Sequence, residues 1–100
     1  MTFQERSALI LASAQTLFVN GQTTEQTIIE AERLGSALGP PVAVTARWSE
    51  LKLESRDGAL LFMVSANPVG VNMARVVKAM RTLKRVESGQ LAPDAAAKAI

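Results

Sequence analysis

The sequence predicts an α+β fold, in which two helices, a three-stranded antiparallel meander and two further helices (ααβββαα) make one domain over residues 1–100. Apolar residues recur at helical spacing before residue 39 and again after residue 72, whereas residues 42–64 alternate or run apolar over strand lengths. A chain of 100 residues with 48% apolar and 20% charged residues has the composition of a single globular domain.

Two helices are expected in the N-terminal part of the chain. Helical periodicity covers residues 3–20, and Gly21 follows where a left-handed cap belongs. Thr23 is placed to accept a hydrogen bond from the amide of Gln26, as an N-cap does, and the apolar repeat that follows ends at Gly39. Two prolines then prevent the helix from continuing.

Three strands are expected over residues 42–48, 51–54 and 59–64, with Arg56-Asp57-Gly58 as the second turn. The third strand is uniformly apolar, so we expect it to be covered on both faces, by the chain's own helices or by a partner chain. We expect Met63, together with Met73 and Met80, to fill gaps in the core.

Two helices are expected after the strands. Asn72 is a plausible N-cap for the strongest helical repeat in the chain, which runs to residue 86, and Pro93 is suited to the first turn of a last short helix. Because that helix is still running at Ile100, we expect the sequence to be part of a longer protein.

The amino-acid composition excludes most known arrangements of catalytic residues. The chain has no Cys and no His, so it lacks thiolate nucleophiles, the commonest metal ligands and the commonest general base. No glycine-rich nucleotide motif is present, and the carboxylate pairs Glu30/Glu32 and Glu50/Glu54 are not spaced to face one another. We therefore predict no enzyme activity, no catalytic residue, no cofactor and no metal.

The C-terminal half carries the largest local charge bias, since Arg75, Lys78, Arg81, Lys84 and Arg85 share one expected helix with no acid between residues 71 and 86. The simplest interpretation is a solvated helix face. The alternative is a free-standing binding module whose basic helix, residues 75–85, contacts nucleic acid or an anionic membrane. A net charge of +2 and few aromatic residues make nucleic acid the weaker alternative.

No apolar run approaches the 18 to 20 or so residues of a membrane-spanning helix, and the N-terminus lacks the features of a signal peptide. The sequence by itself therefore predicts a cytoplasmic location.

Four segments, taken in order, resemble the N-terminal region of the threonine/serine exporter family: residues 20–25, 42–55, 70–75 and 87–96. The resemblance extends over essentially the whole chain. It implies a water-soluble domain on the cytoplasmic face of the membrane, followed in the full protein by a multi-helix membrane domain that exports small hydroxy amino acids. On this basis the chain is expected to be a regulatory or assembly domain.

The resemblance also implies partners and a site. The expected partners are the protein's own membrane domain, which is absent from this sequence, and a small amino acid. Five polar residues at element ends are candidates for binding that amino acid: Thr23, Thr24, Arg47, Asn72 and Arg75. Independently of the family, a small meander leaves an exposed edge strand, and the apolar third strand could pair with its copy, which predicts a homodimer or larger assembly.

Overall fold

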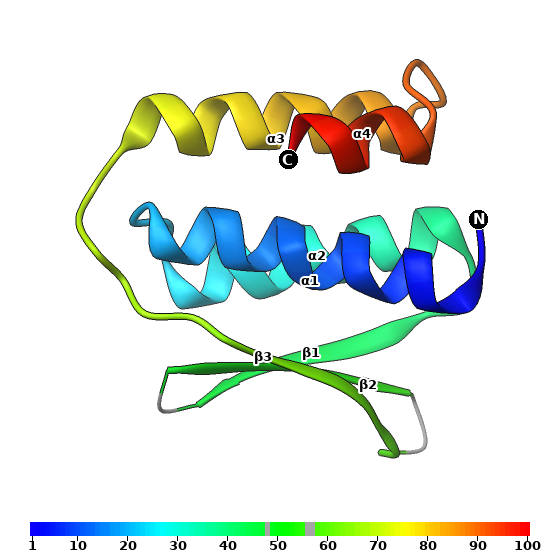
Figure 1. Cartoon of the computed structure of the whole chain (residues 1–100), viewed down its shortest axis with the longest axis horizontal. Helices are drawn as coiled ribbons and strands as arrows, with labels where there is room; N and C mark the ends of the chain where they lie inside the picture. Colours follow the sequence, from blue (N-terminus) through cyan, green and yellow to red (C-terminus); the bar gives the residue numbers. More distant parts are fainter. Residues whose placement is uncertain (48, 56–57) are drawn as a thin grey trace.

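The computed structural model describes residues 1–47, 49–55 and 58–100, and it confirms the predicted α+β fold. Figure 1 shows three layers: a sheet, a middle layer of two helices, and an outer layer of two helices. The first helix pair in the sequence forms the middle layer, and the last pair lies on the side away from the sheet. Each layer is therefore built from elements that are consecutive in the sequence.

The elements agree with the expected ranges to within two or three residues. The N-terminal helices are α1 (Phe3–Val19) and α2 (Thr24–Leu38), the strands are β1 (Val42–Arg47), β2 (Glu50–Ser55) and β3 (Leu60–Ser65), and the C-terminal helices are α3 (Met73–Glu87) and α4 (Pro93–Ala99). Trp48, the expected end of the first strand, and the turn residues Arg56 and Asp57 lie outside the described residues.

Helix α1 forms the centre of the molecule, because it contacts α2, α3 and α4 as well as strands β2 and β3. Leu9, Ile10, Leu11 and Leu17 are all at most 3% exposed. A helix covered by other elements on several sides needs apolar residues around most of its circumference, not along one stripe. The helical periodicity expected over residues 3–20 describes one apolar stripe and so does not account for burial on several sides.

Helix α2 packs closely on strand β1 at Gly35. A Cβ atom at this position would lie 2.7 Å from the Val42 Cγ2 atom, a distance that real side chains do not tolerate. One turn earlier in the helix, the Glu32 carboxylate accepts a hydrogen bond of 2.9 Å from the Val44 amide, which points away from β2. Helix α2 therefore covers the outer edge of β1 and supplies a hydrogen-bond acceptor for one amide of that edge.

A buried arginine connects α1 to the end of α2. Arg6 is 7% exposed, and its Nη2 atom donates to the carbonyl oxygens of Gly35, at 3.0 Å, and Pro40. These carbonyls belong to the last turn of α2 and the loop after it, and the Gly35 carbonyl also accepts from the Gly39 amide at 3.1 Å. Arg6 thus fixes the point at which the chain leaves the helical layer and enters the sheet.

The sheet is an antiparallel meander with the order β1-β2-β3, as predicted. Its helix-facing side includes Val44, Leu51 and Leu53, which are almost fully buried. The expectation that the chain's own helices cover both faces of β3 is wrong: Leu60 is 57% exposed and Met63 is 52% exposed. All of the helices lie on one side of the sheet, so no described element covers the second face of β3, and cover by a partner chain stays a prediction.

The predicted core role is also wrong for two methionines. Met63 lies on the open side of the sheet, and Met73 is 50% exposed at the start of α3. Met80 does pack against the core, where its sulfur lies 3.4 Å from the side-chain nitrogen of Gln22.

No helix within the described ranges is long and apolar enough to cross a membrane.

Replacing Gly35 by alanine tests the close contact between α2 and β1. The added methyl group must displace Val42 or move the helix off the strand, so we expect a loss of about 1 to 3 kcal/mol in unfolding free energy. Urea denaturation followed by circular dichroism measures this loss. Ser36→Ala, at the next and exposed helix position, is the matched control and should change stability by less than about 0.5 kcal/mol. Equal stability of Gly35→Ala and wild type would contradict the packing argument.

Candidate functional site

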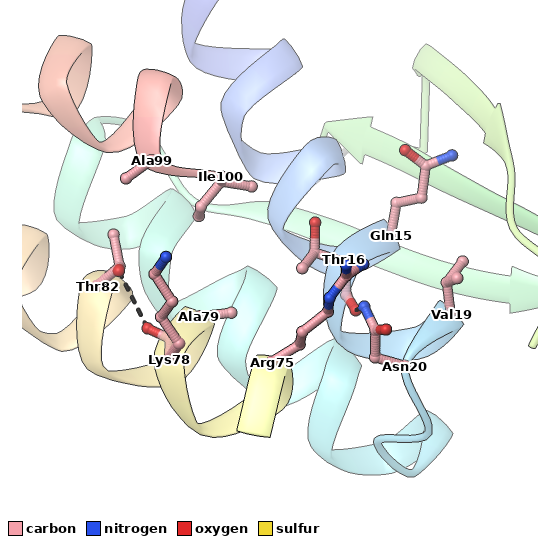
Figure 2. A pocket seen from close by; sticks show the side chains of 10 residues that line it. All are labelled: Gln15, Thr16, Val19, Asn20, Arg75, Lys78, Ala79, Thr82, Ala99 and Ile100. Carbon is pink, nitrogen blue, oxygen red and sulfur yellow. Dashed lines mark hydrogen bonds between the residues drawn. The ribbon is translucent and has the colours of Figure 1, made fainter. Parts of the chain in front are cut away.

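A groove of about 520 Å³ lies between the C-terminal half of α1, the N-terminal half of α3 and the end of α4 (Figure 2). Ten residues line it: Gln15, Thr16, Val19, Asn20, Arg75, Lys78, Ala79, Thr82, Ala99 and Ile100. The volume is in the range of pockets that accept small molecules. Six of the ten side chains are polar, and none is an acid.

Two cations dominate the electrostatics of the groove. Arg75 and Lys78 are three residues apart on α3, so their side chains leave neighbouring positions on the helix. Figure 2 shows the Arg75 side chain extending from α3 toward α1. Within the described ranges, the only ion pair joins Arg33 to Glu30 on α2, so neither groove cation is neutralised by a carboxylate there. The groove therefore has the character of an anion site.

Helix α1 supplies the opposite wall with amide and hydroxyl groups. Asn20 donates from its Nδ2 atom to the Thr16 carbonyl at 2.8 Å, and Gln15 donates from Nε2 to the Ser65 carbonyl at 2.8 Å. These bonds fix both amide groups with their oxygens available, since neither oxygen accepts a hydrogen bond from a described residue. The α1 wall can therefore accept hydrogen bonds, whereas on the α3 wall the two cations only donate them and the Thr82 hydroxyl oxygen can accept.

The segment before α3, residues 69–72, is hydrogen-bonded to the end of α1 beside the groove. The Val69 amide donates to the Val19 carbonyl at 3.3 Å, and the Asn72 amide donates to the Asn20 carbonyl at 2.8 Å. Gly21, with a φ of +104°, allows the backbone of Val71 to approach, since a Cβ there would be 3.2 Å from the Val71 Cα. This segment sets the distance between the start of α3 and the end of α1.

The structure does not bring all five expected site residues together. Only Arg75 lines the groove. Thr23 and Asn72 are N-caps, and their side-chain oxygens accept from the Gln26 amide at 3.1 Å and the Arg75 amide at 3.2 Å. Capping therefore accounts for both residues, and Asn72 contributes by starting the helix that carries Arg75.

The other two expected residues lie elsewhere. Thr24 is the exposed first residue of α2. Arg47 is the exposed last residue of β1, where it pairs in the ladder with Glu50. Neither contributes to the lining of the groove, and Gln15, Thr16 and Asn20 take their place as its polar residues. No motif in the sequence indicated these three residues, which differ from their neighbours only in being polar near the end of an apolar helix.

A pair of carboxylates on α2 and α3 forms a second polar cluster. Glu30 is 2% exposed, and one of its oxygens lies 3.4 Å from Arg33 Nη1. The Oε2 atoms of Glu30 and Glu87 are both buried without a hydrogen-bond donor among the described residues. The pairing was not predicted, because the two residues are far apart in sequence. The described residues hold no group of three or more His, Cys, Asp or Glu suited to a metal ion.

This environment changes the titration of Glu87. Burial raises the pKa of the Glu87 carboxyl above its ordinary value of 4.5, and the Glu30 carboxylate raises this pKa further. Arg33 and Lys84 act in the opposite direction but do not cancel the shift. The folded protein thus holds the Glu87 proton to a higher pH than the unfolded chain does, so this group weakens folding as the pH rises through that interval.

Comparisons with known proteins give no relative from which a role could be transferred. No protein-family model, no curated protein and no solved structure matches the chain. The functional argument therefore depends on the groove and on the sequence resemblance alone.

Replacing Glu87 by glutamine tests the carboxylate pair. At pH 7 the substitution removes the repulsion from Glu30, and we expect a gain of about 0.5 kcal/mol in unfolding free energy, a modest value because Glu87 is half-buried and partly screened. The gain should shrink as the pH falls through the raised pKa of Glu87 toward 4.5, because the wild-type carboxyl takes up its proton over that interval.

Urea titrations at a series of pH values measure this dependence. Glu54→Gln, which removes the same charge from strand β2, is the control and should lack the gain. A gain for Glu87→Gln that is independent of pH would show that charge repulsion is not its cause.

Proposed function

We propose that this chain is the cytoplasmic sensing domain of a membrane exporter of small hydroxy amino acids, and that the groove between α1, α3 and α4 binds the amino acid. The resemblance of four chain segments to the threonine/serine exporter family supports the exporter context. The observation that carries the binding role is the pairing of two cations without carboxylate partners, Arg75 and Lys78, with an acceptor-rich wall on α1.

The groove matches each polar group of a hydroxy amino acid. The α-carboxylate fits against Arg75, whose guanidinium can donate two parallel hydrogen bonds, and against Lys78. The α-ammonium group needs acceptors, which the amide oxygens of Gln15 and Asn20 supply from the other wall. The side-chain hydroxyl can bind Thr16 or Thr82, both of which line the groove.

The proposed role is binding without catalysis. The groove contains cations, amides and hydroxyls, and no lining side chain acts as a base near neutral pH. A nucleophilic threonine would need such a base within hydrogen-bond reach. The Thr82 hydroxyl instead donates to the Lys78 carbonyl at 3.0 Å, in its own helix.

Ligand binding would act on the contact between layers. A ligand held by α1 on one side and by α3 on the other adds bonds between the middle and outer layers. Ala99 and Ile100 at the end of α4 line the same groove, so its occupancy would also restrain α4. In the family that the chain resembles, the membrane domain follows this region, and α4 is then the element through which occupancy reaches it.

Titration calorimetry with L-threonine and L-serine tests the binding role. We expect the double variant Arg75→Gln/Lys78→Gln to weaken binding by about tenfold or more, because a charge-assisted bond to the carboxylate is lost at each position. Arg81→Gln/Lys84→Gln removes the same charge from α3 outside the groove and is the matched control. Absence of threonine binding at millimolar concentrations, or equal loss in both variants, would contradict the proposal.

We also propose that two copies associate through β3. Leu60 and Met63 expose apolar side chains on this edge strand, which has no strand partner on its outer side in the described sheet. A second copy could pair its own β3 antiparallel to the first, which is a two-fold arrangement.

Sedimentation velocity tests the association. We expect wild type to dimerise at micromolar concentrations and Leu60→Lys/Met63→Lys to remain monomeric, since lysine on an edge strand opposes pairing. Thr45→Lys, an exposed position on β1, is the control and should leave the dimer intact. A wild-type protein that stays monomeric at high concentration would exclude this contact.

A further inference from the structure

The outer face of α3 is strongly basic. The buried residues Val76, Ala79, Leu83 and Val86 define the side that faces α1 and α2. With 3.6 residues per turn, Arg81, Lys84 and Arg85 project from the opposite side, and all three are exposed. We call these three residues the basic face. From residue 58 to residue 86 the sequence contains no Asp or Glu. Glu87, the next acid, interacts electrostatically with Lys84 but forms no ion pair with the basic face among the described residues.

Apolar side chains adjoin the basic face at the N-terminal end of α3. Val69 is 81% exposed, Val71 76%, Met73 50% and Val77 43%. We call these four residues the apolar tip. Scattered single apolar residues are normal on a protein surface, but four exposed ones within nine positions of the sequence are a local concentration. Val77 and Arg81 are one helical turn apart, so the apolar tip and the basic face share one side of the helix.

The apolar tip is exposed although its backbone is held in place. The Val69 and Asn72 amides are bonded to carbonyls at the end of α1, and Gly21 packs against Val71. The side chains of Val69 and Val71 nevertheless remain 81% and 76% exposed, so they gain little from burial within the chain. Such an arrangement presents apolar groups to an external phase without requiring the chain to rearrange.

The apolar tip beside the basic face favours a lipid surface over nucleic acid as the binding partner. Aliphatic side chains insert between lipid headgroups and acyl chains, with basic residues beside them over the phosphates. Sequence-independent recognition of single-stranded nucleic acid uses aromatic side chains on which bases stack, and residues 66–87 contain none.

We propose that the outer face of α3 docks this domain on a bilayer rich in anionic phospholipids, with the apolar tip at the headgroup boundary and the basic face over the lipid phosphates. The sheet is the layer farthest from α3, so it would face away from the membrane (Figure 1). This docking does not depend on amino acid binding, because Arg81, Lys84 and Arg85 do not line the groove.

Vesicle co-sedimentation tests the charge requirement. We expect the wild-type chain to bind vesicles of phosphatidylcholine with about 30 mol% phosphatidylserine, to bind pure phosphatidylcholine far less, and to lose binding as salt is added. The variant Arg81→Gln/Lys84→Gln/Arg85→Gln should bind the anionic vesicles roughly 100-fold more weakly, at about fivefold per cation. Arg47→Gln/Lys52→Gln/Lys98→Gln removes three cations outside α3 and should bind within a few-fold of wild type. Equal losses in the two triple variants, or equal wild-type binding to both vesicle types, would overturn the proposal.

A second variant separates the bilayer from other polyanions. Val69→Ser/Val77→Ser changes two exposed side chains, so circular dichroism should show an unaltered fold. We expect it to weaken binding to anionic vesicles by roughly tenfold, since valine insertion is lost. Binding of the wild-type chain to a 20-mer single-stranded oligonucleotide, by fluorescence anisotropy, should be much weaker than binding to the vesicles. Unchanged vesicle binding by the serine variant, or tighter binding to the oligonucleotide, would assign the face to nucleic acid or a nonspecific polyanion.

Discussion

The position of α1 between the sheet and the outer helices is the constraint on which the rest of the structure depends. A chain of 100 residues can support three layers only if one element is covered from several directions, and Leu9, Ile10, Leu11 and Leu17 give α1 the apolar circumference that this requires. Polar residues inside α1 are small, such as Ser13, whose buried hydroxyl donates to the Leu9 carbonyl at 2.7 Å. Larger polar residues lie near the ends of α1 or in the gaps between the layers. Gln15, Thr16 and Asn20 lie in such a gap, so the groove is a consequence of how the layers meet.

Most of the fold was predictable because its signals are local. Caps, glycines, prolines and repeats of period 2 or 3.6 are each contained within a few residues, and Thr23 and Asn72 cap their helices as expected. Contacts between layers were not predictable from such patterns. Whether β3 is covered depends on where four helices pack, and the pairing of Glu30 with Glu87 depends on how α2 lies against α3.

For the candidate site, too, local sequence signals were predictive and contacts between layers were not. Arg75 was expected from its place at the start of a helix, and it lines the groove. Thr23 and Asn72 were expected at the site because they are polar residues at element ends, yet such positions also favour capping, which is what they do. Arg47 lies on the sheet because β1 runs away from the helical layers. Selecting polar residues at the ends of helices and strands therefore includes residues that do not line the site, unless the order of the layers is known.

The bond from the Val44 amide to Glu32 limits how this sheet can grow. With a carboxylate on the middle of the β1 edge, and α2 packed beside it, an incoming strand would find that side closed. Growth is then open only at β3, and a sheet that can add strands on one side alone stops once two copies have met. If copies associate through β3 as proposed, the glutamate would keep further copies from adding at β1.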